Sequence, residues 1–124
     1  MKEEIEILKS RALRFLSKAK SDLEEGDFDI AAFHVEQAIQ LILKYELAKR
    51  IGYFPKTHSL SRLFDELSTI KKDAKSFYKR NLVIFKLIED AYIASRYLPR
   101  KYEREEVESM IRLAEKVMRW LRVR

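Results

Sequence analysis

The sequence predicts an all-α fold, an antiparallel up-and-down bundle of four long helices plus one short helix. Loop-forming residues are scarce, because the 124 residues include only two glycines and two prolines. Apolar residues recur at spacings of three and four along most of the chain, which is the period of an amphipathic helix. The connections between these stretches are short, as in antiparallel bundles. We therefore expect a single domain over residues 1–124.

The first predicted helix spans residues 2–25 and carries one narrow apolar stripe. Its apolar side chains are Ile5, Leu8, Ala12, Phe15, Ala19 and Leu23. This spacing fits a helix that packs along a single face. Gly26 ends the helix, and Asp27 is a suitable N-cap for the helix that follows.

The second helix is expected over residues 28–51, with Gly52 as its natural end. The loop that follows leads into a short helix over residues 60–67. Either Thr57 or Ser59 can supply the N-cap of this short helix, because both carry a side-chain oxygen that accepts a backbone hydrogen bond.

The fourth helical segment is expected over residues 74–95, with a bend near Arg80–Asn81. Pro99 makes continuation of this helix unfavourable, because the residue before a proline avoids the helical conformation. The last helix spans about residues 104–123 and again carries a single apolar stripe.

The two middle long helices are apolar on more than one face, unlike the first and the last. Such helices are either central in their fold or bury a second face against another chain. We expect the helix over 28–51 and the segment over 74–95 to form the centre of the bundle and to supply a homodimer surface. The alternative is that both are buried within one monomer.

The composition argues against several classes of protein. The absence of cysteine excludes a disulfide framework, a zinc–thiolate site and a cysteine nucleophile, and it suits a reducing cytoplasm. The opening residues MKEEIEILKS lack the apolar core of a signal peptide. The longest apolar run, Leu82 to Phe85, is far shorter than the ~20 residues that cross a bilayer, so no membrane partner is expected. Few amides with many Lys and Glu favour a thermophilic source.

Neither histidine belongs to a metal-binding motif. His34 lies on the apolar side of the second helix, where a hydrogen-bonded packing residue is commoner than a ligand. His58 lies in the loop beside Lys56, where it either meets a ligand or caps the next helix. The sequence contains no His-Glu-x-x-His, no paired Glu-x-x-His and no glycine-rich phosphate loop. No metal and no cofactor is predicted.

The segment that precedes the last helix is the best candidate binding site. Four cations alternate with two tyrosines there: Arg96, Tyr97, Arg100, Lys101, Tyr102 and Arg104. Guanidinium groups bind phosphate bidentately, and tyrosine rings stack on bases. The net charge of +6 also favours nucleotide or nucleic-acid phosphates. The alternative is a solvated, charged helix junction whose tyrosines pack into the bundle.

Four segments, taken in order, resemble the HEPN domain family. They are AAFHVEQA at 31–38 with Lys44 further on, FPKTHSL at 54–60, AYIASRYLP at 91–99 and AEKV at 114–117. The resemblance covers nearly the whole chain and implies a dimerising bundle of four or five helices. HEPN proteins are often encoded beside a minimal nucleotidyltransferase and act with it, in many cases as a toxin–antitoxin pair. The family name reflects a proposed nucleotide-binding role.

Some branches of the family are metal-independent ribonucleases with an Arg followed, after four to six residues, by a His. Counted from Arg96, that histidine would fall at Lys101, Tyr102 or Glu103. A group that titrates near neutral pH is thus missing from the expected place. The resemblance also implies a charged Glu–Lys pair on the second helix, where this chain has Gln40 and Leu41.

Three hypotheses follow. The first is a non-catalytic homodimer that binds a nucleotide, a minimal nucleotidyltransferase or both. Its basic groove would be built by Arg96, Tyr97, Arg100 and Lys101, with Lys56 and His58 at the edge. The second is a metal-independent ribonuclease that cleaves RNA, in which Arg96 stabilises the phosphorane and Lys101, Tyr102 or His58 replaces the missing histidine. The third is a structural dimer whose apolar faces recognise a helix of another protein.

Overall fold

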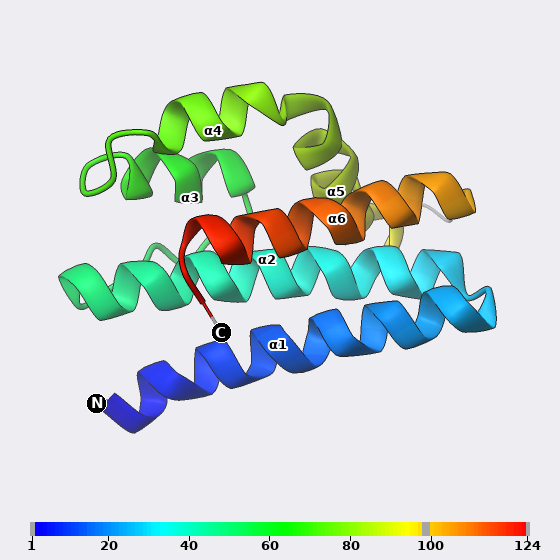
Figure 1. Ribbon diagram of the computed structural model, residues 1–124, viewed down its shortest axis with the longest axis horizontal. Coiled ribbons are helices and arrows are strands. Elements are labelled where there is room, and N and C mark those ends of the chain that lie inside the picture. Colours follow the sequence, from blue (N-terminus) through cyan, green and yellow to red (C-terminus); the bar gives the residue numbers. More distant parts are fainter. Residues whose placement is uncertain (1, 98–99, 124) are drawn as a thin grey trace.

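The computed structural model describes residues 2–97 and 100–123, and within these residues the fold is all-helical, as predicted. The helices, in chain order, are α1 (Lys2–Glu25), α2 (Phe28–Ile51), α3 (Leu60–Leu67), α4 (Ala74–Arg80), α5 (Leu82–Ala94) and α6 (Arg104–Trp120) (Figure 1). Among the described residues, no helix has both the length and the apolar character needed to cross a membrane.

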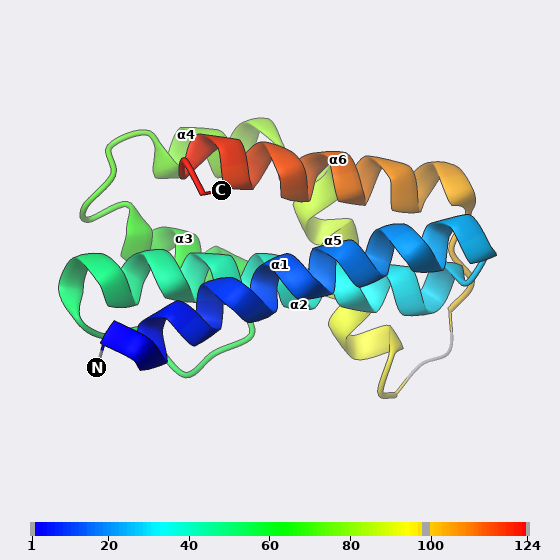
Figure 2. The same ribbon diagram turned by 60° about the horizontal axis from the view of Figure 1, so that its bottom comes forward.

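Helix α2 is the centre of the bundle. It packs against α1, α3, α5 and α6, and more than half of its 24 residues are buried. Helix α1 runs antiparallel to α2, whereas α6 runs beside α2 in the same direction (Figure 1). Figure 2 shows α5 crossing behind α2 towards the segment that leads into α6. The wide apolar surface of α2 is thus explained by packing within one chain.

The ends of α2 and α3 show which of the predicted caps form. The N–H of Gly52 donates to the carbonyl of Ala48 at 3.0 Å, and a φ of 84° places this glycine in the left-handed region, as predicted. Ser59 caps α3 by accepting a hydrogen bond from the N–H of Arg62 at 3.2 Å. Asp27 holds the N-cap position of α2 but makes no side-chain capping bond. Its φ of −93° and ψ of 72° fall outside the extended conformation that aims a capping side chain at the helix.

The segment expected as one bent helix over 74–95 is two helices that meet at Asn81. The side chain of Asn81 donates to the carbonyl of Phe77 at 2.9 Å, which satisfies one free carbonyl at the end of α4. The backbone carbonyl of Asn81 then accepts the N–H of Phe85 at 3.0 Å and begins α5. The chain changes direction between the two helices (Figure 1). Helix α6 ends at Trp120 rather than at residue 123.

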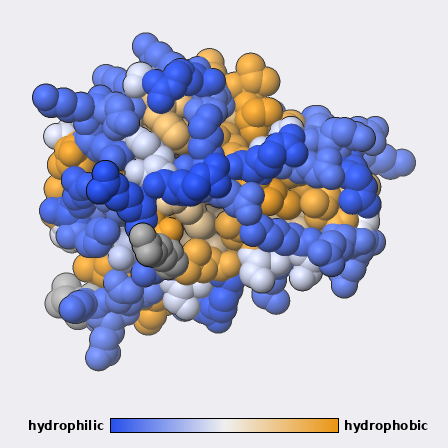
Figure 3. All heavy atoms as spheres, viewed as in Figure 1, coloured by the Kyte–Doolittle hydropathy of each residue, from blue (hydrophilic) through white to orange (hydrophobic). Residues whose placement is uncertain are grey.

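The expectation that this segment shares the centre of the bundle with α2 is wrong. In α5 only Phe85, Ile88 and Ala91 are buried. Val83 is 80% exposed, and Leu82 is 40% exposed. The break at Asn81 makes α5 short, so it packs one side on α2 and α6 and leaves the other free. Figure 3 shows hydrophobic atoms at the surface where α4 meets α5.

An aromatic cluster joins the helices that surround the second half of α2. Phe64 of α3 contacts Phe85 of α5, with ring centroids 4.9 Å apart. Phe77 of α4 stacks on Trp120 of α6 at 4.2 Å. The indole Nε1 of Trp120 also donates to Asp73 Oδ2 at 2.9 Å. These contacts fix α4 against the end of α6 and leave the beginning of α6 free to form the site described next.

Candidate functional site

A groove of about 800 Å³ lies where the first turns of α2, the end of α5 and the segment before α6 meet. Its volume falls in the range of small-molecule sites. Its apolar floor is formed by Ile30, Phe33, Ala91 and Ala94. The polar groups around the floor are Asp29, Ser95, Arg96, Arg100, Lys101 and Tyr102. The fold therefore brings together three of the cations that the sequence predicted, Arg96, Arg100 and Lys101.

The guanidinium group of Arg96 packs on two aromatic rings. Its guanidinium carbon lies 4.1 Å from the ring centre of Tyr92 and 5.4 Å from that of Phe33. Its Nη1 atom is 3.5 Å from both the Tyr92 carbonyl and Ser95 Oγ, which is the long limit of a hydrogen bond. In residues 2–97 and 100–123 Arg96 forms no ion pair with a carboxylate. Its N–H edges are thus available for a phosphate.

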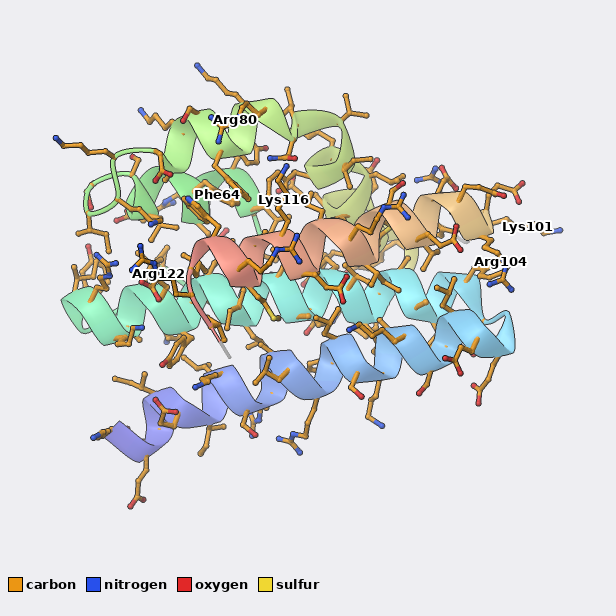
Figure 4. All side chains as sticks on the ribbon, in the orientation of Figure 1. Phe64, Arg80, Lys101, Arg104, Lys116 and Arg122 are labelled. Carbon is orange, nitrogen blue, oxygen red and sulfur yellow. The ribbon has the colours of Figure 1, made fainter. Side chains whose placement is uncertain are left out.

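The other two cations of the groove, Arg100 and Lys101, differ in whether they form an ion pair within the protein. Arg100 is paired with Glu106, with 3.1 Å between Nη2 and Oε2, and its guanidinium lies 4.4 Å above the ring of Tyr102. Lys101 is exposed and forms no ion pair within the described part of the chain, and Figure 4 shows it at the outer end of the bundle. Lys101 can therefore reach a ligand without losing a partner.

The tyrosines of this segment have opposite environments. Tyr102 is 5% exposed and packs into the bundle. For this tyrosine the structure agrees with the alternative given from the sequence, in which the tyrosines of the segment are packing residues. Burial raises the pKa of the Tyr102 hydroxyl, so this group is neutral at physiological pH and is a poor base. Tyr97 is 69% exposed and does not line the groove.

The loop residues Lys56 and His58 do not line the groove either. The ring of His58 stacks on Tyr92, with 4.0 Å between centroids and 13° between planes. Arg96 packs on the same Tyr92 ring, so this tyrosine links His58 to the groove. His58 does not cap α3, since Ser59 supplies that bond. Lys56 is exposed in the loop.

A buried carboxyl group that interacts electrostatically with Arg96 was not predicted as a site residue from the sequence. Glu36 of α2 is fully buried and accepts hydrogen bonds from Gln37 Nε2, at 2.7 Å, and from Gln40 Nε2. Lys44 Nζ extends this chain by donating to Gln40 Oε1 at 3.3 Å. Burial raises the pKa of Glu36 from 4.5 to about 7, opposed by the two amides and by the positive charges of Arg96 and Lys44.

The spacing of Glu36, Gln40 and Lys44 in the sequence indicates that these three polar side chains can interact. Glu36, Gln40 and Lys44 follow one another at intervals of four, so they share one face of a helix whose other residues are mostly apolar. The groove floor gave a weaker signal. Ile30 and Phe33 have the spacing of ordinary core residues, and only the position of α5 shows that they border an open groove.

His34 has the packing role that the sequence predicted. Its Nδ1 lies 2.6 Å from Asp22 Oδ2, and its ring packs against Phe15 and Phe33. This contact ties the end of α1 to the start of α2. Within the described residues no group of three or more His, Cys, Asp or Glu side chains is arranged to hold a metal ion.

Comparison with known proteins identifies a family. The model of the HEPN domain matches residues 5–124, which is nearly the whole chain. No curated protein matches the sequence.

The pKa of Glu36 predicts how stability changes with pH. The folded state holds a proton on Glu36 up to about pH 7, whereas the unfolded chain releases it near 4.5. Between these values the folded state binds more protons, so the free energy of unfolding falls as pH rises. Glu36→Gln removes this decrease in the free energy of unfolding, which amounts to at most about 3 kcal/mol. Urea denaturation should show the variant gaining stability over wild type from about pH 5 to about pH 8.

The matched control is Glu24→Gln, which changes an exposed carboxyl group on α1. The difference in unfolding free energy between this control and wild type should stay nearly constant over the same pH range. Parallel pH curves for wild type and Glu36→Gln would contradict the assignment of a raised pKa to Glu36.

Proposed function

The chain belongs to the HEPN domain family, and we propose that it binds a nucleotide in the groove between α2, α5 and the segment before α6. The observation that carries this proposal is Arg96, stacked on Tyr92 and Phe33 with its N–H edges free of carboxylate partners in the described chain. Such a guanidinium is preorganised for a phosphate. Lys101 supplies a second positive charge at the rim.

The rest of the groove suits the remainder of a nucleotide. Ile30, Phe33 and the alanines of α5 offer an apolar surface on which a base can lie. The carboxylate of Asp29 at the rim can accept a hydrogen bond from a ribose hydroxyl or an exocyclic amine. We therefore place the phosphates at Arg96 and Lys101 and the base over Phe33.

We propose a binding function before a catalytic one. The positions at which the family's ribonucleases carry histidine are occupied by Lys101, Tyr102 and Glu103. Tyr102 is buried and neutral, so it does not replace a histidine as proton acceptor. The segment that supplies the phosphate contacts thus lacks a histidine, the usual acid or base of such a reaction.

Arg96→Ala should weaken nucleotide binding at least about tenfold, because a charged hydrogen-bond partner of the phosphate is lost. Isothermal titration calorimetry with ATP, GTP and their monophosphates measures this effect. The matched control is Arg11→Ala, which removes one exposed arginine from α1. Equal affinities for wild type and Arg96→Ala would rule out this groove as the phosphate site, and no heat with any nucleotide would refute the proposal.

A second candidate function is favoured by the contact between His58 and Tyr92. Because His58 and Arg96 both pack on this ring, a histidine and a phosphate-binding arginine are linked through one residue. In a metal-independent ribonuclease His58 would accept the proton of a ribose 2′-hydroxyl, whose oxygen would attack phosphorus. Arg96 would stabilise the phosphorane, and the P–O5′ bond would break as the 5′-oxygen takes a proton from water, which gives a 2′,3′-cyclic phosphate.

Incubating the protein with labelled RNA in the presence of EDTA tests this candidate. Ribonuclease activity predicts cleavage that falls at least about a hundredfold in both His58→Ala and Arg96→Ala. His34→Ala is the control, because the His34 ring is hydrogen-bonded to Asp22 and packs between helices. Cleavage that persists in this variant would show that the effect is specific to His58. Absence of cleavage by wild type, or cleavage equal in all variants, would leave the binding function alone.

We further propose that the domain forms a homodimer through the outer face of α5. This face exposes Leu82, Val83 and Ile93. A second copy related by a two-fold axis could place the same residues against one another, as symmetric dimers do. This assignment keeps the dimer predicted from the sequence but locates it on α5 alone, because α2 is covered within the monomer.

Val83→Glu should convert the dimer to a monomer, because a charge replaces an 80% exposed apolar side chain at the centre of the proposed contact. Light scattering after size-exclusion chromatography gives the mass of wild type and variant. Ser17→Glu, an exposed change on α1, should leave the mass unchanged. A monomeric wild type would exclude the dimer.

The proposed partner of this dimer is a minimal nucleotidyltransferase, in an arrangement of the toxin–antitoxin kind. The proposal of this partner rests on membership of the HEPN family alone. A reading frame for a small nucleotidyltransferase next to the gene would support the pairing, and its absence would remove the basis for it.

A further inference from the structure

Charges are segregated along the bundle. Residues 71–80 and 112–122 together contain nine lysines and arginines and two acidic residues. Residues 22–29 and 103–108 contain nine acidic residues and one arginine. The basic segments form α4 and the second half of α6, whereas the acidic segments form the α1–α2 turn and the beginning of α6 (Figure 1). The two groups therefore lie towards opposite ends of the molecule.

Both acidic residues of the basic segments are already engaged. Asp73 accepts the indole hydrogen bond of Trp120 at 2.9 Å, and Glu115 pairs with Lys20 of α1 at 2.7 Å. Arg112, Lys116 and Arg119 are exposed and form no ion pair within the described residues. Their positive charge is thus largely uncompensated.

Arg80 of α4 lies beside the cations of the second half of α6 (Figure 4). Stacking of Phe77 on Trp120 and the 3.3 Å hydrogen bond from Lys116 to Asn81 hold α4 against α6. On α6, Arg112, Lys116 and Arg119 follow at intervals of four and three, which places neighbours about 5–6 Å apart on one side. Figure 4 shows Arg80 and Lys116 on the facing sides of α4 and α6, and Figure 3 shows hydrophilic atoms over much of this region.

We propose that this surface binds the phosphate backbone of a nucleic acid strand. We define the basic face as Arg80 of α4 together with the exposed cations of the second half of α6, which are Arg112, Lys116 and Arg119 (Figure 4). The proposal goes beyond nucleotide binding in the groove and does not depend on it. A row of cations at fixed spacing neutralises consecutive phosphates and releases their counterions, which needs no contact with the bases.

The side chains favour a nucleic acid over an acidic protein. Protein interfaces depend on aromatic and apolar anchors at the centre of the contact. Here Phe77 is only 3% exposed, and the ring of Trp120 is stacked on it beneath the ammonium group of Lys71, 4.9 Å from the ring centre. Phe77 and Trp120 are thus used to join α4 and α6, and charged groups dominate the basic face.

Binding of a fluorescein-labelled single-stranded RNA, followed by anisotropy at several salt concentrations, tests the proposal. The variant replaces Arg112, Lys116 and Arg119 by glutamine. The control replaces Arg11, Arg14 and Lys18 by glutamine, which removes the same charge from exposed positions on α1. Those positions point away from Lys20, the residue of α1 that pairs with α6.

The α6 variant should bind RNA at least about tenfold more weakly, and the slope of log affinity against log salt should shrink by about 2, since each lost contact with a single strand contributes about 0.7. The α1 control should keep most of the affinity and slope. Circular dichroism confirms that both variants are folded. Equal losses in both variants would show a diffuse effect of net charge and overturn the proposal.

Two further experiments distinguish nucleic-acid binding at the basic face from nucleotide binding in the groove and from binding of an acidic protein. Arg96→Ala should weaken mononucleotide binding, whereas the α6 variant should weaken RNA binding and keep the wild-type affinity for mononucleotides. If wild type bound no RNA at low salt, or if polyglutamate displaced RNA as effectively as unlabelled RNA of equal charge, the basic face would not be a nucleic-acid surface. Loss of nucleotide binding alone would refute only the groove.

Discussion

Helix α2 is packed by four other helices, so its polar side chains must find their partners inside the protein. Burying a polar group without a hydrogen bond costs about 2 to 7 kcal/mol. The chain meets this constraint with Gln40 and Gln37 at Glu36, with Asp22 at His34, and with Arg50 at Oε2 of Glu46. Oε1 of Glu46 has no hydrogen bond among the described residues and is balanced by the charge of Lys49, whose Nζ lies 3.3 Å away. The order of polar groups along α2 therefore also sets the electrostatic background of the groove.

The groove and the basic face represent two ways of attracting phosphate. In the groove, Arg96 is oriented by two aromatic rings, and acidic residues such as Asp29 and Glu106 stand close by. Such surroundings suit a small ligand with a few phosphates, because a long polyanion would also meet the acidic end of the bundle. The basic face has the opposite character, since it is open and nearly free of carboxylates. Screening over about 10 Å at ordinary salt keeps the two regions electrically separate.

The sequence predicted most of the fold because helix ends are encoded locally. Gly52 and Ser59 end and begin helices through contacts within a few residues. The break at Asn81 was less visible, because it depends on one side chain that bonds back to Phe77. The cations of the site were visible as a cluster, but its floor was not. Burial of Glu36 and exposure of Val83 both depend on how the helices pack against one another, which periodicity alone does not determine.

Trp120 is the single tryptophan in the sequence, and its position at the junction of α4 and α6 has a practical consequence. The indole is stacked on Phe77, covered by Lys71 and bonded through its Nε1 to Asp73. All three partners belong to α4 or to the turn that precedes it, so separation of α4 from α6 would change these three neighbours at once. Phe64 of α3, with ring centroids 6.0 Å apart, is a further neighbour of the indole. The protein thus carries an intrinsic optical reporter, whose emission distinguishes local detachment of these helices from loss of the whole helical structure.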